Sequence, residues 1–107
     1  MIVTLFAAMV LDQLVELSLA VPARGIEEPC FPMKAGDRLE YEFSATAELD
    51  FNLHYTAEGV VFPLDLKAVT EHAGQYVAPA EHSYCLMWTN KRSEPTTLEY
   101  RYRTYTH

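Results

Sequence analysis

Three side chains with ligand chemistry stand at alternate positions near the middle of the chain. Asp50, Asn52 and His54 are spaced i, i+2 and i+4, so a β-strand would present all three on one face. A carboxylate, an amide and an imidazole in a row could bind a metal ion or a small polar ligand. The same row is also what the solvated face of an ordinary half-buried strand contains. The row is therefore a candidate binding site, with a plain solvated face as the simpler interpretation.

A second group with ligand chemistry consists of His82, Cys85 and Met87. Blue-copper sites combine two His, one Cys and a weak axial Met. Their ligand loop normally carries the Cys before the His, whereas here the His comes first, and a disulfide at Cys85 would remove the thiolate. Neither His72 nor His82 is spaced so as to lie near His54. We therefore expect no metal and no other cofactor.

The two cysteines, Cys30 and Cys85, allow either one disulfide or two free thiols. An even number in a chain with a secretion-like start favours a disulfide, which would stabilise the fold by about 4 kcal/mol in the chain-entropy model. The alternative is that Cys85 packs as a small hydrophobic residue. Two cysteines are too few for a structural zinc site built mainly on Cys.

Nucleophilic catalysis has no recognisable arrangement in the sequence. There is no Gly-x-Ser-x-Gly elbow and no His placed beside a Ser or Cys with an orienting acid. The 4 glycines are not clustered into a phosphate-binding loop. Trp88 and the 7 tyrosines could form a recognition patch, because Trp and Tyr are enriched at interface hot spots. Core filling explains Trp88, Tyr41 and Tyr55 at least as well, and we expect Tyr102 and Tyr105 to be the more exposed members. The sequence predicts a protein that is not an enzyme.

The elements that would position these residues are strands. From residue 38 onward apolar and polar residues alternate, as in Leu39, Tyr41 and Phe43 against Glu40 and Glu42, which is the pattern of a strand with one wet face. Turn residues separate the runs. The predicted strands are residues 38–46, 49–56, 60–62, 64–69, 75–78, 84–89 and 96–105. Six to eight short strands of this kind predict an all-β antiparallel sandwich over residues 38–107, of the jelly-roll or a similar type.

Composition and charge narrow the function classes. The chain has 107 residues, 50% of them hydrophobic and 21% charged, which is the balance of one folded domain. With 8 Lys and Arg against 15 Asp and Glu, the formal net charge is −7. Nucleic-acid binding depends on neutralising phosphates with Lys and Arg, so we expect no nucleic-acid partner. A polybasic membrane-surface role is excluded for the same reason.

The start of the chain allows two interpretations. Residues 1–11 are apolar except for Thr4, and residues 18–20 and 21–23 each offer small residues at the −3 and −1 positions of a signal-peptide cleavage site. The basic start of a secretory signal is missing. If residues 1–23 are retained, their apolar spacing predicts an amphipathic helix. Asp12 and Glu16 interrupt the apolar run, so no stable membrane span is expected in the mature chain. Residues 24–37, with Pro29 and Pro32, are predicted to be a connector.

The order of several short motifs resembles the GOLD (Golgi dynamics) domain of cargo receptors in the early secretory pathway. These motifs are Cys30-Phe31, Ala35-Gly36-Asp37, the alternating residues 39–43, residues 49–53, Gly74-x-Tyr76, and residues 83–90 with the sequence SYCLMWTN. The resemblance implies a β-sandwich, a Cys30–Cys85 disulfide and protein recognition without catalysis. Here Tyr84 directly precedes Cys85, whereas the family has one residue between them.

The sequence therefore predicts a free-standing GOLD-like module that binds a protein partner. We expect it to be secreted, periplasmic or in the lumen of the secretory pathway. An acidic surface would favour basic partners. The alternative from a different class is a β-sandwich that carries a small ligand or metal on the Asp50, Asn52 and His54 face. Candidate binding residues are these three and Trp88.

Overall fold

The computed structural model describes residues 9–107, and these residues form an all-β fold. The strands are β1 (Val10–Val21), β2 (Ile26–Glu27), β3 (Cys30–Met33), β4 (Arg38–Thr56), β5 (Val60–Val77), β6 (His82–Thr89) and β7 (Thr96–Thr106). The predicted all-β class is confirmed. Within residues 9–107 there is no helix that is long and apolar enough to cross a membrane.

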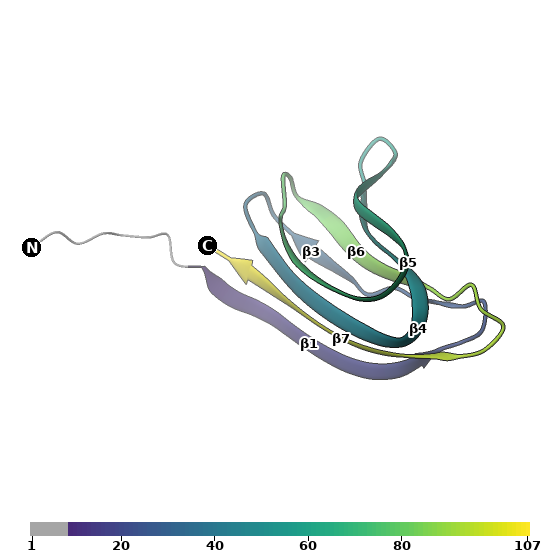
Figure 1. Cartoon of the computed structure of the whole chain (residues 1–107). Helices are drawn as coiled ribbons and strands as arrows, with labels where there is room; N and C mark the ends of the chain where they lie inside the picture. Colours follow the sequence, from purple (N-terminus) through teal and green to yellow (C-terminus); the bar gives the residue numbers. More distant parts are fainter. Residues whose placement is uncertain (1–8) are drawn as a thin grey trace, which may run out of the picture.

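A single antiparallel sheet, bent until it nearly closes into a barrel, contains all seven strands (Figure 1). Strand β4 lies at its centre and changes neighbours along its length. Arg38–Ala45 pairs with β7, whereas Asp50–Tyr55 pairs with β6. Strand β5 follows the other edge of β4 throughout, with a register shift between Ser44 and Leu49. Such a strand that switches neighbours at an irregularity forms the corner between two packed layers, so the predicted sandwich is right in outline, although its layers are continuous.

The core lies inside this bend, where the two halves of β4 face one another. Phe43 from the first half and Phe51 from the second have ring centroids 4.7 Å apart. Trp88 of β6 contacts both rings, at 5.4 Å and 5.2 Å, and stacks on Tyr100 of β7 at 4.6 Å. The alternation predicted from residue 38 onward therefore places its apolar residues in the core, as expected.

Three predicted interruptions are absent. Strand β4 continues through residues 47–48, and β5 runs without a break through Pro63 and residues 71–74. Pro63 falls between the pairs Leu53–Leu64 and Tyr55–Val61, where the ladder has a register shift, so its missing N–H costs no regular ladder bond. Gly74 lies opposite Tyr41, and a Cβ there would be 2.6 Å from the Tyr41 hydroxyl. Both residues that suggested breaks are thus accommodated within a continuous strand.

The helix predicted for the start of the chain is wrong for residues 10–21, which form strand β1. Residues 1–8 of that prediction lie outside the described residues. Strand β1 pairs with β7 from Val10–Thr106 to Val21–Thr96. The residues predicted to be a plain connector also contain β2 and β3, which both pair with β6. Pairing with the free edges of β7 and β6 therefore decided the conformation of these segments.

Cleavage after Ala23 would remove residues 1–23 and with them strand β1. We expect this truncation to lower the free energy of unfolding by at least about 1.5 kcal/mol, because Val21 is completely buried and burial of such a side chain contributes about 1.5–3 kcal/mol. Urea unfolding followed by circular dichroism measures the difference. A chain that begins at Met9 is the matched control, since it keeps every described strand pair. Equal stability of the two truncated chains would contradict the prediction.

Candidate functional site

A disulfide joins the two cysteines, as the even count favoured and the GOLD resemblance implied. Cys30 of β3 lies directly opposite Cys85 of β6, with a Cα–Cα distance of 4.1 Å and an S–S distance of 2.07 Å. Cys85 alternates with the buried Tyr84 and Leu86, so its side chain lies on the outer face of the sheet. The bridge therefore fastens the short strand β3 to β6 from outside the core.

His54 lies beside this disulfide and has a partner at each ring nitrogen. Its Nδ1 is 2.6 Å from Asn52 Oδ1, and its Nε2 is 3.1 Å from Glu28 Oε2. His54 also lies directly opposite Cys85 in the β4–β6 pairing. Glu28, His54 and Cys85 bring ligand-type atoms within 4.8 Å of one another. Sequence reasoning found Asn52 and His54 but missed Glu28, because nothing in the spacing connects the connector to this face.

Asp50, the third member of the predicted row, has other partners. Its carboxylate lies 2.6 Å from Lys91 Nζ and accepts a hydrogen bond from the Ala68 N–H at 3.0 Å. Desolvation by itself would raise the pKa of Asp50, but these two hydrogen bonds and the charges of Lys91 and Lys67 hold the pKa below its ordinary value. The predicted row is therefore divided into two separate sets of contacts instead of one open site.

The predicted aromatic recognition patch does not agree with the positions of its members. Trp88 is 1% exposed and Tyr102 is 5% exposed, so both belong to the core. Tyr105 is partly exposed, and its ring lies under the Arg38 guanidinium at 4.6 Å. For Trp88 the alternative explanation, core filling, is the correct one. The residues weighed for copper are also occupied, since Cys85 is in the disulfide and His82 stacks on Tyr55 at 4.9 Å.

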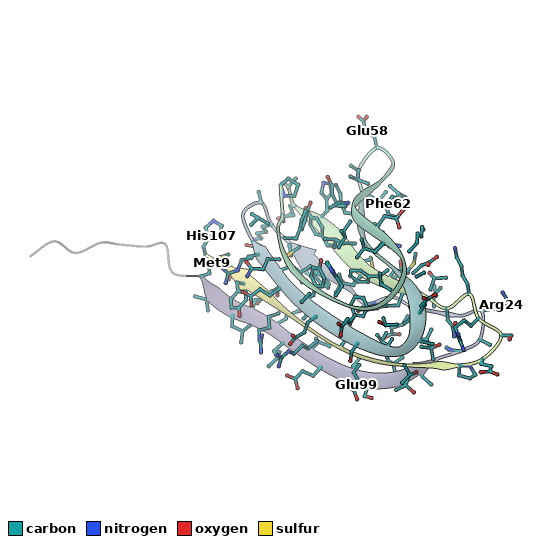
Figure 2. All side chains as sticks on the ribbon, viewed as in Figure 1. Met9, Arg24, Glu58, Phe62, Glu99 and His107 are labelled. Carbon is teal, nitrogen blue, oxygen red and sulfur yellow. A yellow bond between two sulfur atoms is a disulfide. The ribbon has the colours of Figure 1, made fainter. Side chains whose placement is uncertain are left out.

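The turn predicted between residues 56 and 60 forms a hairpin between β4 and β5, residues 56–62, but sequence reasoning missed how exposed its apolar side chains are. Figure 2 shows Glu58 at its tip and Phe62 on the returning strand, both projecting away from the rest of the sheet. Val60, Val61 and Phe62 are 55%, 39% and 50% exposed. Three consecutive apolar residues cannot all face the core from a strand, because alternate side chains point to opposite faces. The run Val60-Val61-Phe62 in the sequence could therefore have indicated that apolar side chains are exposed here.

An open groove on another part of the surface crosses β1, β7, β4 and β5. Its charged lining consists of Glu16, Glu42, Glu71, Glu99 and Arg101. Arg101 forms ion pairs with Glu42 and, at 3.9 Å, with Glu16. Four carboxylates facing one guanidinium make this groove acidic. Part of the acidic surface expected from the composition therefore lies in this groove.

The comparisons with known proteins show the fold and leave the family open. No protein-family model matches the sequence, and no curated protein matches it. The chain is similar in structure to the Yersinia pseudotuberculosis-derived mitogen YPM, with a TM-score of 0.56 and 15% identity over 89% of this chain and 86% of that one. It is also similar to Aeromonas hydrophila PliG, a periplasmic inhibitor of g-type lysozyme, with a TM-score of 0.60 and 15% identity over 87% of this chain and 86% of that one.

These two structures are small β proteins and are not GOLD domains, so the resemblance found in the sequence is supported only at the level of an all-β antiparallel fold. Neither of these two proteins is described as an enzyme.

The lowered pKa of Asp50 leads to a pH-dependent prediction. We expect Asp50→Asn to lower the free energy of unfolding by about 1 kcal/mol at neutral pH. Because the folded-state pKa lies below the unfolded value of about 3.9, the carboxylate contributes its stability above that value and loses it as the pH falls through the folded-state pKa. The difference between variant and native chain should therefore shrink below about pH 4. Urea unfolding over a range of pH measures it.

Asp65→Asn is the matched control for this measurement. Asp65 also pairs with a lysine, Lys67, at 3.2 Å, but both side chains are well exposed. Exposed ion pairs contribute little to stability, so this control should unfold almost like the native chain. A loss at Asp50→Asn that stays constant down to the lowest pH would show that the carboxylate charge is not its cause.

Proposed function

We propose that this protein is an extracytoplasmic, non-catalytic module that binds another protein. Two of its structural neighbours are described as a periplasmic lysozyme inhibitor and a mitogen, and the inhibitor is described as acting on a protein, g-type lysozyme. The Cys30–Cys85 disulfide supports the same compartment, because disulfides persist in oxidising environments. The observation that carries the proposal is the exposed, projecting β4–β5 hairpin.

The hairpin has the properties of a contact element. Its three apolar side chains, Val60, Val61 and Phe62, are each more than a third exposed. At the base of the hairpin, the Phe62 ring lies beside the His54 ring, with the two ring centroids 5.7 Å apart. A preordered projecting segment loses little conformational freedom on binding, and its apolar side chains contribute most when they enter a partner's cleft.

The charge of the protein indicates what kind of partner suits it. The formal net charge is −7, and the groove across β1, β7, β4 and β5 is lined by four glutamates. Opposite charges accelerate encounter and favour the correct partner more than they raise the final affinity. A basic protein with an apolar cleft is therefore the partner class that we propose. A g-type lysozyme, the target of one structural neighbour, is the first candidate.

A GOLD-type module is the narrower form of this proposal. The disulfide supports it, since the GOLD resemblance implies that pairing. The two structural neighbours support only the broader form, a small β protein that binds proteins. The alternative from the sequence, a carrier that binds a ligand on the Asp50, Asn52 and His54 face, has less support, because all three side chains already have protein partners.

A double substitution in the hairpin tests the proposed contact element. We expect Val60→Ser with Phe62→Ser to weaken binding to a purified g-type lysozyme by at least about tenfold, since each apolar side chain buried at an interface contributes on the order of 1.5 kcal/mol. Isothermal titration calorimetry measures the affinity. Size-exclusion chromatography of the chain with an extracytoplasmic extract extends the test to other partners.

Val77→Ser is the control for the hairpin variant. Val77 is also on β5 and is 58% exposed, but it lies at the opposite end of the strand from the hairpin. This control should bind as the native chain does. Unchanged binding by the hairpin variant would refute the hairpin as the contact element, and the absence of any protein complex with lysozyme or extract would refute the proposed function.

A further inference from the structure

Four side chains with metal-ligand chemistry gather on the outer face of the sheet around the disulfide. His54, Cys85 and Cys30 form a row across three strands, because His54 lies opposite Cys85 and Cys85 lies opposite Cys30. Glu28 precedes β3 and reaches the same place, with its carboxylate 3.1 Å from His54 Nε2. We call Glu28, Cys30, His54 and Cys85 the cysteine–histidine patch.

The orientation of His54 is that of a metal ligand. In the neutral ring, Nδ1–H donates to Asn52 Oδ1 at 2.6 Å, and the lone pair is then on Nε2. Metal-binding histidines are usually held in this way, with the second nitrogen donating to an oxygen acceptor. That lone pair would face the Glu28 carboxylate. A metal ion placed between His54 Nε2 and Glu28 Oε2 would have a ligand atom on each side.

We propose that reduction of the Cys30–Cys85 disulfide converts the patch into a zinc site. A dithiol supplies two electrons and two protons, the S–S bond breaks to give two thiols, and the dithiol becomes a disulfide. When Zn²⁺ binds, both thiols release their protons to water and become thiolates. His54 Nε2 and the Glu28 carboxylate complete a set of four ligands. The inference does not depend on the proposed protein-binding function.

The donor set and its spacing suit zinc. Zn²⁺ prefers four ligands in a tetrahedron and accepts thiolate, imidazole and carboxylate together. Bonds of about 2.0–2.3 Å place ligand atoms roughly 3.3–3.8 Å apart. Those of Glu28, His54 and Cys85 already lie within 4.8 Å of one another, and the two sulfurs need only separate from their bonded distance. Small side-chain movements therefore assemble the site.

The patch is accessible to both reagents. Glu28 and Cys30 are exposed, and His54 and Cys85 are partly buried. Exposed disulfides are the ones that exchange with thiols most readily. A bound zinc ion would replace the covalent link between β3 and β6 and would extend it to β4 through His54. It would thus keep the edge of the sheet fastened after reduction.

Metal titration of the full chain in its oxidised and reduced forms tests the proposal. The reductant is a trialkylphosphine, which takes up the oxygen of a water molecule while the disulfide becomes two thiols. We expect Zn²⁺ in excess to raise the midpoint of thermal unfolding by at least about 5 °C in the reduced chain, and to leave the oxidised chain unchanged. Co²⁺ added to the reduced chain should give the thiolate charge-transfer and visible bands of a tetrahedral ion.

Single variants identify the remaining ligands. His54→Ala and Glu28→Gln should each weaken zinc binding to the reduced chain by at least about tenfold, the scale on which even indirect partners of metal ligands act. His107→Ala is the matched control, because His107 lies near Asp37 and Gly36 and away from the patch. The double variant Cys30→Ser with Cys85→Ser should show no response to zinc. Its midpoint of thermal unfolding also measures how much stability is lost with the disulfide.

Each alternative outcome overturns the proposal. The inference is wrong if zinc stabilises the oxidised and reduced chains equally, or if His54→Ala and Glu28→Gln bind zinc as tightly as His107→Ala does. If reduction unfolds the chain, circular dichroism shows whether zinc restores the β signal, as the proposal requires. Zinc binding without that recovery would show that the cysteines of the unfolded chain alone hold the ion. None of these outcomes bears on hairpin binding to a protein.

Discussion

The contact of Phe43 and Phe51 with Trp88 is the interaction on which the rest of the structure depends. Strand β4 carries apolar residues into the core on both sides of its irregularity, so folding the strand back on itself brings the two phenylalanines together. Trp88 fills the space between them and Tyr100. Aromatic pairs of this kind contribute about 0.5–1.5 kcal/mol each beyond the area that they bury. Together with other core contacts, such as Phe31 stacked on Tyr102, they hold the first layer against the second.

This core determines which residues remain for function. It takes up Trp88 and Tyr102, the aromatic residues that looked most suited to recognition. Besides the acidic groove, two outer features remain. The hairpin of residues 56–62 extends β4 and β5 beyond the core, so its apolar side chains are exposed, with the Phe62 ring beside His54. The cysteine–histidine patch lies on the opposite face of β6 from Tyr84 and Leu86, where a disulfide and polar ligands cost no apolar contact.

The sequence predicted the strands that alternate apolar and polar residues. It did not predict the features that depend on which strands pair with one another. The strands around Tyr41, Phe51 and Trp88 follow from a period of two, and the disulfide follows from the motif order. Strand β1 was missed because its apolar residues fit a helical period as well as the alternating Val15, Leu17 and Leu19, and only the free edge of β7 decides between them. Glu28 was missed because its partner, His54, is distant in sequence and adjacent only through β3 and β6.

His54 connects the two proposed activities physically. Its ring supports Phe62 at the base of the hairpin, while its Nε2 faces the patch around the disulfide. An ion held by Nε2 would fix the ring plane against rotation, and the ring plane is the surface on which Phe62 rests. Coupling between two sites requires an element whose arrangement both can bias, and a single imidazole shared by both is the shortest such element. With zinc bound as proposed, His54 would contact both the ion and the hairpin.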